Sequence, residues 1–310
     1  MILTVTPNTA LDHVYEVERY VPGARLNAFA EAECIGGKGN LTSAFAVDFG
    51  ADSVSLGFAA GENGRRLAQF LRKRGVRADL TPAQGETRRI MVVVDQKRHG
   101  QTWLLPETLR VARAHERDLE ERLARWLPKS SWLALCGSLP PGCSPPLYRR
   151  FTKLAHACRV PVLIDSRGRA LALALAASPQ VVKLNRDELQ ATFGEPVSTE
   201  PTLAMALRRL LAEGVELAVC TLGAEGAMAM TSGAGWRILV PAIQMVSSAG
   251  SGDAFTATLL VWRAKGAEWP VALRWAAAAG TAKALNAPTD SPLDLDRVRA
   301  IYRRVKVSRL

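Results

Sequence analysis

Short apolar runs along this chain alternate with longer stretches in which apolar residues recur every three or four positions. The runs have the length of buried strands, and the spacing in the longer stretches is typical of amphipathic helices. This order favours an α/β fold, in which a mostly parallel sheet carries helices on both faces. The predicted strands are Ile2–Thr6, Ser53–Phe58, Trp132–Cys136, Val160–Asp165, Val181–Leu184 and Leu217–Leu222, and the predicted helices are Gly64–Arg74, Ala114–Leu127, Leu147–Ala157, Arg186–Phe193 and Thr202–Glu213.

Two segments interrupt this alternation. Val14–Ala32 and Arg88–Leu105 show polar alternation and few helix signals, so we expect them to form a small sheet outside the main layer, such as a lid. The C-terminal part, Asp253–Leu310, reads as mainly helical. No internal repeat, low-complexity tract or linker is visible, so residues 1–310 are predicted to form a single domain.

The composition is that of an ordinary globular protein, with 310 residues, 48% hydrophobic and 22% charged. No targeting segment is apparent, and no apolar run approaches the about 20 residues that a membrane span needs. The five cysteines are scattered and contain no Cys-x-x-Cys pair, which argues against a structural zinc site. We therefore expect a cytoplasmic protein with no membrane partner.

The net charge of +11 allows either a nucleic-acid surface or a preference for anionic small molecules. The densest basic stretch, Arg65–Arg74, also carries Leu67, Phe70 and Leu71 at helical spacing, which makes the charges the solvated face of a helix. No zinc-finger spacing or RNA-recognition signature accompanies it. We expect no nucleic-acid partner.

The strongest chemical motif is Ser248–Phe255, which follows the strand-like stretch Ile243–Val246 and opens an apolar helix. Its small residues allow a ligand to approach the backbone, and the first amides of a helix form an anion site suited to a phosphoryl group. Asp253 in this position is a candidate base that accepts a proton from an attacking hydroxyl. The alternative is that Asp253 only caps the helix.

A second glycine-rich motif, Ile35–Asn40, places Lys38 among three glycines. It lacks the frame of a Walker A motif, but its amides and its cation suit a hydroxyl-rich or anionic ligand. The alternative is a tight turn into the helix that follows. Near the first strand, Asp12 in the segment Asn8–Asp12 can accept two sugar hydroxyls, or serve a turn or a helix cap.

Three further polar segments directly follow predicted strands, where ligands of parallel sheets bind. Cys136–Gly142 is either a ligand-contacting loop or a plain strand-to-helix connection. Lys183–Glu188 offers Asn185 and Glu188 as oxygen ligands for a hydrated Mg²⁺, or starts a helix with a capping pair. Thr221–Ala227 suits a nucleotide phosphate or ribose, or a strand–turn–strand connection.

Taken together and in this order, these motifs resemble the ribokinase (PfkB) carbohydrate kinase family, and are similar to its 1-phosphofructokinase and tagatose-6-phosphate kinase branch. The resemblance runs from the opening strand to about Thr289, and its most specific pieces are Gly36–Gly39, Gly137–Gly142, Lys183–Glu188 and Gly250–Asp253. It implies a three-layer α/β/α sandwich with a small β lid. It also implies an ATP-dependent phosphotransferase that acts on a sugar or sugar phosphate, such as fructose 1-phosphate or tagatose 6-phosphate.

The resemblance also implies roles for individual residues. Asp253 would be the base, and Gly250, Ser251 and Gly252 the anion hole for the γ-phosphate. Asn185 and Glu188 would organise Mg²⁺ through water, and the lids of two subunits would clasp each other in a homodimer. The implied nucleotide-binding residues are Lys183, Asn185, Glu188, Thr221, Gly223 and Gly226, the implied acceptor-binding residues are Asp12, Gly37, Lys38, Asn40, Arg88 and Ser138, and Asp165 and Gly168 are second-tier candidates near the phosphates.

Several departures from the family pattern fall on the acceptor side. Leu41 stands where the family has an asparagine, and Asn40 comes one place early, which turns a helical side chain by about 100°. Ile90 replaces a second asparagine, and Trp103–Glu107 replaces an acidic stretch. These changes predict an acceptor other than the standard hexose phosphates. A nucleoside or other non-hexose kinase and a catalytically weak sugar-phosphate-binding regulator are the alternatives.

Overall fold

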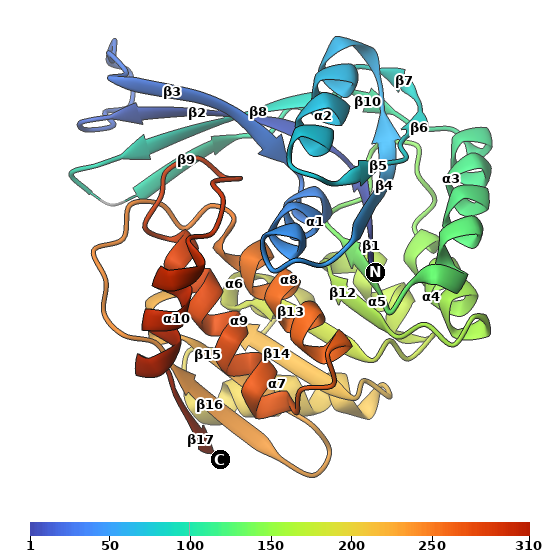
Figure 1. Cartoon of the computed structure of the whole chain (residues 1–310), viewed down its shortest axis with the longest axis vertical. Coiled ribbons are helices and arrows are strands. Elements are labelled where there is room, and N and C mark those ends of the chain that lie inside the picture. Colours follow the sequence, from blue (N-terminus) through green and yellow to red (C-terminus); the bar gives the residue numbers. More distant parts are fainter. Residues whose placement is uncertain (99) are drawn as a thin grey trace.

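The computed structural model describes residues 1–310 with the exception of His99, which falls in the second predicted lid segment. The main sheet has 11 strands in the order β17-β16-β15-β14-β13-β12-β11-β1-β4-β5, with β6 beside β4 (Figure 1). Its centre is parallel, as predicted. The central strands are β1 (Ile2–Asn8), β4 (Ser53–Ala59), β11 (Trp132–Cys136), β12 (Val162–Asp165), β13 (Val181–Asn185) and β14 (Leu217–Thr221).

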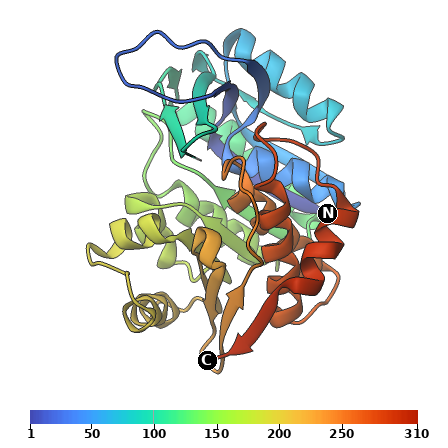
Figure 2. The same cartoon turned by 90° about the vertical axis from the view of Figure 1, so that its left-hand side faces the viewer.

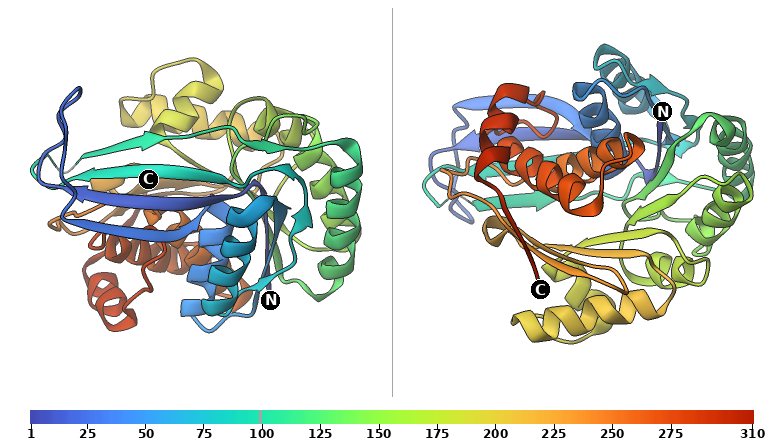
Figure 3. Two further views of the ribbon diagram at one scale, coloured as in Figure 1. Left: turned by 90° about the horizontal axis from the view of Figure 1, so that it is seen from above. Right: turned by 60° about the horizontal axis from the view of Figure 1, so that its bottom comes forward.

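Helices cover both faces of this sheet, which confirms the predicted fold class (Figure 3). One face packs against α1 (Lys38–Asp48), α2 (Gly61–Lys73), α8 (Ser251–Ala264), α9 (Trp269–Lys283) and α10 (Leu295–Arg304). The other face packs against α3 (Arg113–Trp126), α4 (Leu147–Ala157), α5 (Gly168–Leu175), α6 (Arg186–Phe193) and α7 (Glu200–Ala212). The patterning predicted most of these helices but missed α5, which spans only 8 residues.

The edges of the main sheet are short or antiparallel. β15 (Ala227–Met230), β16 (Gly235–Leu239) and β17 (Lys306–Arg309) pair antiparallel beyond β14, whereas β5 (Arg77–Ala78) and β6 (Thr81–Pro82) close the opposite edge. The C-terminal part is mainly helical, as predicted, and forms α8, α9 and α10. Strand β17 was not predicted.

A separate sheet of 4 strands, called the small sheet below, projects from one end of the molecule (Figures 1 and 2). Its order is β3-β2-β8-β9, from β2 (Ala10–Val17), β3 (Ala30–Gly36), β8 (Arg88–Asp95) and β9 (Gly100–Leu104). Strand β2 starts four residues earlier than the segment predicted at Val14. Asp12 therefore lies in a strand, and neither in a turn nor at a helix cap. A further pair, β7 (Gln84–Gly85) and β10 (Leu109–Arg110), lies beside the main sheet.

One predicted strand is wrong. The segment Ile243–Val246 before α8 has no strand pairing. The amides of Val246 and Ser247 instead donate to the carbonyl of Ala284, 2.9 and 3.2 Å away, at the end of α9. The start of α8 is thus held by the chain that follows α9. Among the described residues, no helix is both long and apolar enough to cross a membrane.

Candidate active site

The topology concentrates polar residues at one edge of the main sheet. Strand β1 lies between β11 and β4, so the chain builds the sheet outward from β1 in both directions. Ligands of such sheets bind at the carboxyl ends of the strands, near the point where the direction changes. Asn8, Asp165, Asn185 and Thr221 end the strands β1, β12, β13 and β14 at this edge.

The amino end of α8 faces the same edge. Gly250 is its N-cap in the left-handed conformation, with φ of 77°, and Asp253 lies in the first turn, 7% exposed. A Cβ atom on Gly252 would lie 2.9 Å from the Nζ atom of Lys183, so this lysine approaches the helix backbone closely. A lysine and the positive end of a helix dipole together make a site for an anion.

Two lysines and two carboxylates form a compact network beside this helix end. Asp165 is fully buried, with Oδ1 2.6 Å from the Nζ of Lys38 and Oδ2 2.8 Å from the Nζ of Lys183. Burial opposes the ionisation of Asp165, but these lysines outweigh it and hold the pKa of Asp165 at about 2. Lys38 also lies 2.7 Å from Oε1 of Glu188. Lys38 was predicted to bind the acceptor, whereas its ammonium group is engaged here.

Asp253 faces this network without an ion-pair partner of its own among the described residues. Burial raises the pKa of Asp253 to about 7, and the negative charge of Asp165 adds to the increase, while Lys183 and Lys38 oppose it. A carboxylate with a pKa near neutrality is matched to general-base chemistry. The helix-cap alternative finds no support, since the N-cap of α8 is Gly250 and shows no side-chain cap bond.

The pair Asn185 and Glu188 forms the capping box that was the alternative to a metal site. The amide of Glu188 donates to Oδ1 of Asn185 at 2.8 Å, and the amide of Asn185 donates to Oε2 of Glu188 at 3.0 Å. These bonds fix the two side chains at the end of β13. Any contact with a metal ion would be made by the remaining lone pairs of these side-chain oxygens or by a bridging water.

The small sheet carries a second group of polar residues. Asp12 on β2 is buried and its Oδ1 has no hydrogen-bond partner among the described residues. Burial raises the pKa of Asp12 to about 8, the hydroxyl of Thr289 and the charge of Arg88 oppose this increase, and Asp253 adds to it. Arg88 on β8 donates through Nη2 to the carbonyl of Asn8 at 3.2 Å, and the Nδ2 of Asn8 donates to Oγ of Ser138 at 3.2 Å. Asp12, Arg88 and Ser138 are thus brought together, with Asn8 between them.

Asn40 does not join this group. It is fully buried on α1, where Nδ2 donates to the carbonyl of Gly36 at 2.8 Å and Oδ1 accepts the hydroxyl of Ser55 at 2.7 Å. Its prediction as an acceptor ligand therefore finds no support in the geometry. The departures Leu41 and Ile90 are buried in apolar clusters, Leu41 in the main core and Ile90 within the small sheet.

The segment after β14 forms the strand–turn–strand connection that was the alternative to a nucleotide-binding segment. A short 3₁₀ turn, Gly223–Glu225, leads directly into β15. A Cβ atom on Gly226 would lie 2.1 Å from the carbonyl oxygen of Ile238, so the neighbouring strand already requires this glycine. Gly223, by contrast, faces open space, and Thr221 at the end of β14 is half-buried. These two remain the nucleotide-binding candidates of the segment.

Sequence reasoning missed a group of residues in the loop after α9. The Oδ2 atom of Asp290 accepts the amide of Ile35 at 3.0 Å, and the hydroxyl of Thr289 donates to the carbonyl of Ile35 at 3.1 Å. This loop therefore fastens β3 beside Asp12. Because 254 or more residues separate the partners, no local pattern announces the contact.

Known proteins resemble this chain in sequence and in fold. Residues 6–295 match the pfkB family of carbohydrate kinases. A 1-phosphofructokinase of Xanthomonas campestris is 31% identical over 83% of this chain and 82% of its own length. A Thermotoga maritima protein described as a possible 1-phosphofructokinase superposes with a TM-score of 0.91 at 25% identity, covering 100% of this chain and 99% of that one. The ribokinase of Arabidopsis thaliana, complexed with ribose and ATP, shares the fold with a TM-score of 0.80 at 20% identity, over 97% and 98% of the two chains.

Proposed function

This chain belongs to the pfkB family of carbohydrate kinases and is a sugar kinase, and from that premise we propose that it phosphorylates a hexose phosphate with ATP. Fructose 1-phosphate is the first candidate acceptor, because two relatives at 31% and 32% identity are named 1-phosphofructokinase. A different acceptor, which the departures at Leu41 and Ile90 predict, is the alternative. The observation that carries the proposal is the placement of Asp253. A buried carboxylate with a pKa of about 7 lies at the amino end of α8, beside the lysines of the Asp165 network.

In the proposed reaction, Asp253 accepts the proton of the acceptor hydroxyl as that oxygen bonds to the γ-phosphorus. The bond from the γ-phosphorus to the β–γ bridging oxygen breaks, and ADP leaves. The helix end at Gly250–Gly252 and the ammonium of Lys183 stabilise the negative charge on the transferred group. Asp165 holds Lys183 and Lys38 in place, since it bonds both. The protein thus contributes mainly position and charge, which is what phosphoryl transfer requires.

ATP and Mg²⁺ fit the residues at the ends of β13 and β14. Glu188 and Asn185 are fixed by their capping box and present oxygen atoms, the donor type that Mg²⁺ prefers. We propose that they hold the ion through water, and that Thr221 and Gly223 line the nucleotide. When bound, the ion would supply positive charge that offsets the negative charge of the phosphates.

Asp12, Arg88 and Ser138 are proposed to hold the acceptor. The buried Oδ1 of Asp12 and the buried Nε of Arg88 lack partners among the described residues, and such atoms usually find one in a ligand or water. The guanidinium of Arg88 suits an anionic acceptor. The small sheet that carries Asp12 and Arg88 would act as the lid that excludes water.

A homodimer through the small sheet remains our expectation. Met91 and Leu104 lie directly opposite each other on β8 and β9 and are 39% and 55% exposed, beside Leu105, which is 55% exposed. Such side chains suit a protein contact. Sedimentation of the purified protein would give its mass.

The deciding experiment measures ADP release with Mg-ATP against a panel of hexose phosphates, free sugars and nucleosides. We expect fructose 1-phosphate to give the highest kcat/KM. Asp253→Asn should lower kcat by roughly 10²- to 10⁴-fold, the range for loss of a general base. Asp296→Asn is the matched control, because Asp296 also lies in the first turn of a helix but is 90% exposed.

Each other outcome has a clear meaning. A preferred nucleoside would establish the alternative acceptor class. ADP release no faster than with Asp253→Asn for every acceptor, combined with tight sugar-phosphate binding, would contradict the kinase proposal and favour the regulatory protein.

A further inference from the structure

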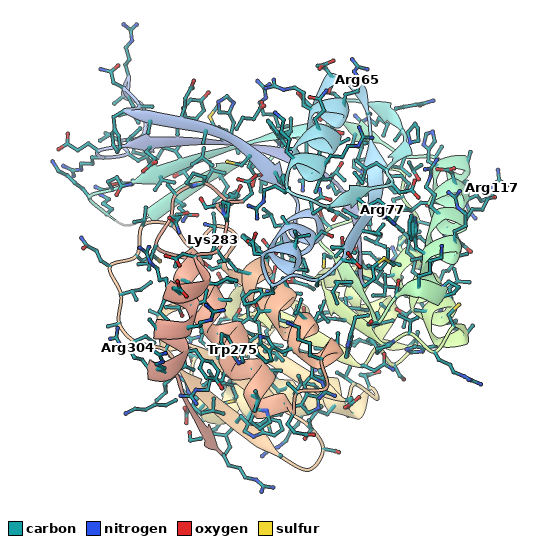
Figure 4. All side chains as sticks on the ribbon, viewed as in Figure 1. Arg65, Arg77, Arg117, Trp275, Lys283 and Arg304 are labelled. Atoms are coloured by element: carbon teal, nitrogen blue, oxygen red, sulfur yellow. The ribbon has the colours of Figure 1, made fainter. Side chains whose placement is uncertain are left out.

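Lys283, the last residue of α9, is a fully buried lysine that the proposed reaction does not use (Figure 4). Its ammonium donates to the carbonyl of Asn286 at 3.2 Å. Among the described residues, no carboxylate lies within ion-pair distance of this ammonium. Burying a charge without a partner is costly, so the position calls for a reason.

The side chain of Lys283 reaches the start of the proposed phosphoryl-binding helix. A Cβ atom on Gly250, the N-cap of α8, would lie 3.2 Å from the Cε atom of Lys283 and 2.4 Å from the carbonyl oxygen of Thr289. Gly250 is thus packed between the lysine stem and the loop that follows α9. On the other side of the turn, the amides of Val246 and Ser247 bond to the carbonyl of Ala284.

Lys283 therefore lies between two chain segments that meet next to the amino end of α8. One is the turn 246–250 before α8, and the other is the loop 284–290 after α9. An ammonium group has three donors, of which the structure assigns one to Asn286. Burial lowers the pKa of Lys283 to about 8, and the carboxyl groups of Asp290 in the loop and Asp253 on α8 oppose this decrease. Cys34 on β3 also lies nearby as a neutral thiol, because burial raises its pKa to about 12.

We propose that the ammonium of Lys283 is a built-in monovalent cation that joins these two segments and so positions the amino end of α8 for the transferred phosphoryl group. The inference rests on the proposed kinase function. Backbone carbonyls bind small monovalent cations in proteins, and a tethered ammonium supplies the same charge without capture of a free ion. Lys283 acts through Gly250 and the helix end, and is a positioning residue.

The test compares two substitutions that remove the charge but differ in volume. Lys283→Ala leaves space for a small cation, whereas Lys283→Met fills most of that space with a neutral chain. In buffers free of small monovalent cations, both variants should lose roughly tenfold to hundredfold in kcat. Addition of ammonium, methylammonium or potassium should restore Lys283→Ala and leave Lys283→Met low. The wild-type protein should respond to none of them.

Lys153→Ala is the matched control, since Lys153 is an exposed lysine on α4. It should keep wild-type activity under every salt condition. Circular dichroism and Tm show which variants are folded. A folded Lys283→Ala that no cation restores, or a wild-type enzyme that itself requires a monovalent cation, would overturn the proposal.

A second readout separates this inference from the kinase proposal. Calorimetry measures ADP binding to each variant with and without ammonium. We expect ammonium to tighten ADP binding to Lys283→Ala only, even if no acceptor is found. Identical ADP affinity with and without ammonium, in a folded Lys283→Ala, would overturn the role of Lys283 whatever the acceptor panel shows.

Discussion

The phosphate-binding side and the acceptor-binding side of this site differ in whether their buried polar groups already have partners within the protein. On the phosphate side, Asp165 is bonded to Lys38 and Lys183, and Glu188 is bonded to Lys38 and to the amide of Asn185. On the acceptor side, the buried Oδ1 of Asp12 and Nε of Arg88 have no partner among the described residues. The lysine–carboxylate network of the first side is satisfied within the protein, although the buried hydroxyl of Ser251 beside it has no partner among the described residues. The second side has bonding capacity that a ligand would satisfy.

This difference predicts which quantity each substitution changes. Removal of a charge from a closed network leaves another buried charge unpaired, so the fold loses stability. Removal of a buried polar group that has no partner in the free protein should change the stability of that protein little, but it should weaken binding of the acceptor. Stability and KM should therefore separate the two sides of the site.

The largest effect should come from Asp165→Ala. It leaves the ammonium of Lys183, which is 3% exposed, without a carboxylate. Loss of one partner of a buried pair typically costs about 3–5 kcal/mol in the free energy of unfolding. Denaturant titration measures the change.

Its control is the double substitution Asp165→Leu with Lys183→Met, which removes the buried carboxylate and one of its two lysines. That variant should recover part of the lost stability while it remains inactive. Equal stability of Asp165→Ala and the wild type would show that the ion pairs of Asp165 do not stabilise the fold.

Arg88→Met should act on binding. We expect the KM for a sugar phosphate to rise by about tenfold to a hundredfold, because a hydrogen bond to a charged group is worth about 1.5–3 kcal/mol. The free energy of unfolding should change little, since the bond that Arg88 makes to the Asn8 carbonyl is long, at 3.2 Å. Arg89→Met is the matched control, because Arg89 is the next residue on β8, is exposed and pairs with Glu33. Equal KM values in the two variants would contradict the assignment of Arg88 to the acceptor.

The dependence of kcat/KM on pH should follow Asp253. Burial raises the pKa of Asp253 to about 7, and a base works only when deprotonated. Activity should therefore rise with pH and level off above this pKa. One pH unit below the pKa it should be about tenfold lower than at the plateau. Burial also raises the pKa of Asp12 to about 8, so the same profile for Asp12→Asn shows which limb belongs to Asp253. A flat profile from pH 5 to 9 would argue against Asp253 as the base.

The same contrast explains how far sequence reasoning reached. The central strands and the Gly250–Asp253 motif could be predicted, since each is local: an apolar run, or small residues before a helix. The partners of Lys38 could not, because Asp165 and Glu188 lie 127 and 150 residues away. Strand β17 was missed because four residues after a helix carry too little pattern, and its pairing with β16 depends on distant residues.

The smallest kinetic effect should come from Asn40→Ala, which tests a residue that the family resemblance assigned to the acceptor. In the structure the side-chain amide of Asn40 is buried and hydrogen-bonded to Gly36 and Ser55. The substitution leaves these two groups without their partner, which typically costs about 1–3 kcal/mol in the free energy of unfolding. The KM for the acceptor should stay within about twofold of the wild type, since no bond to a ligand is lost. A KM increase as large as that of Arg88→Met would mean that the Asn40 amide turns toward the acceptor when it binds. Asn40 would then belong with Asp12 and Arg88 on the acceptor side.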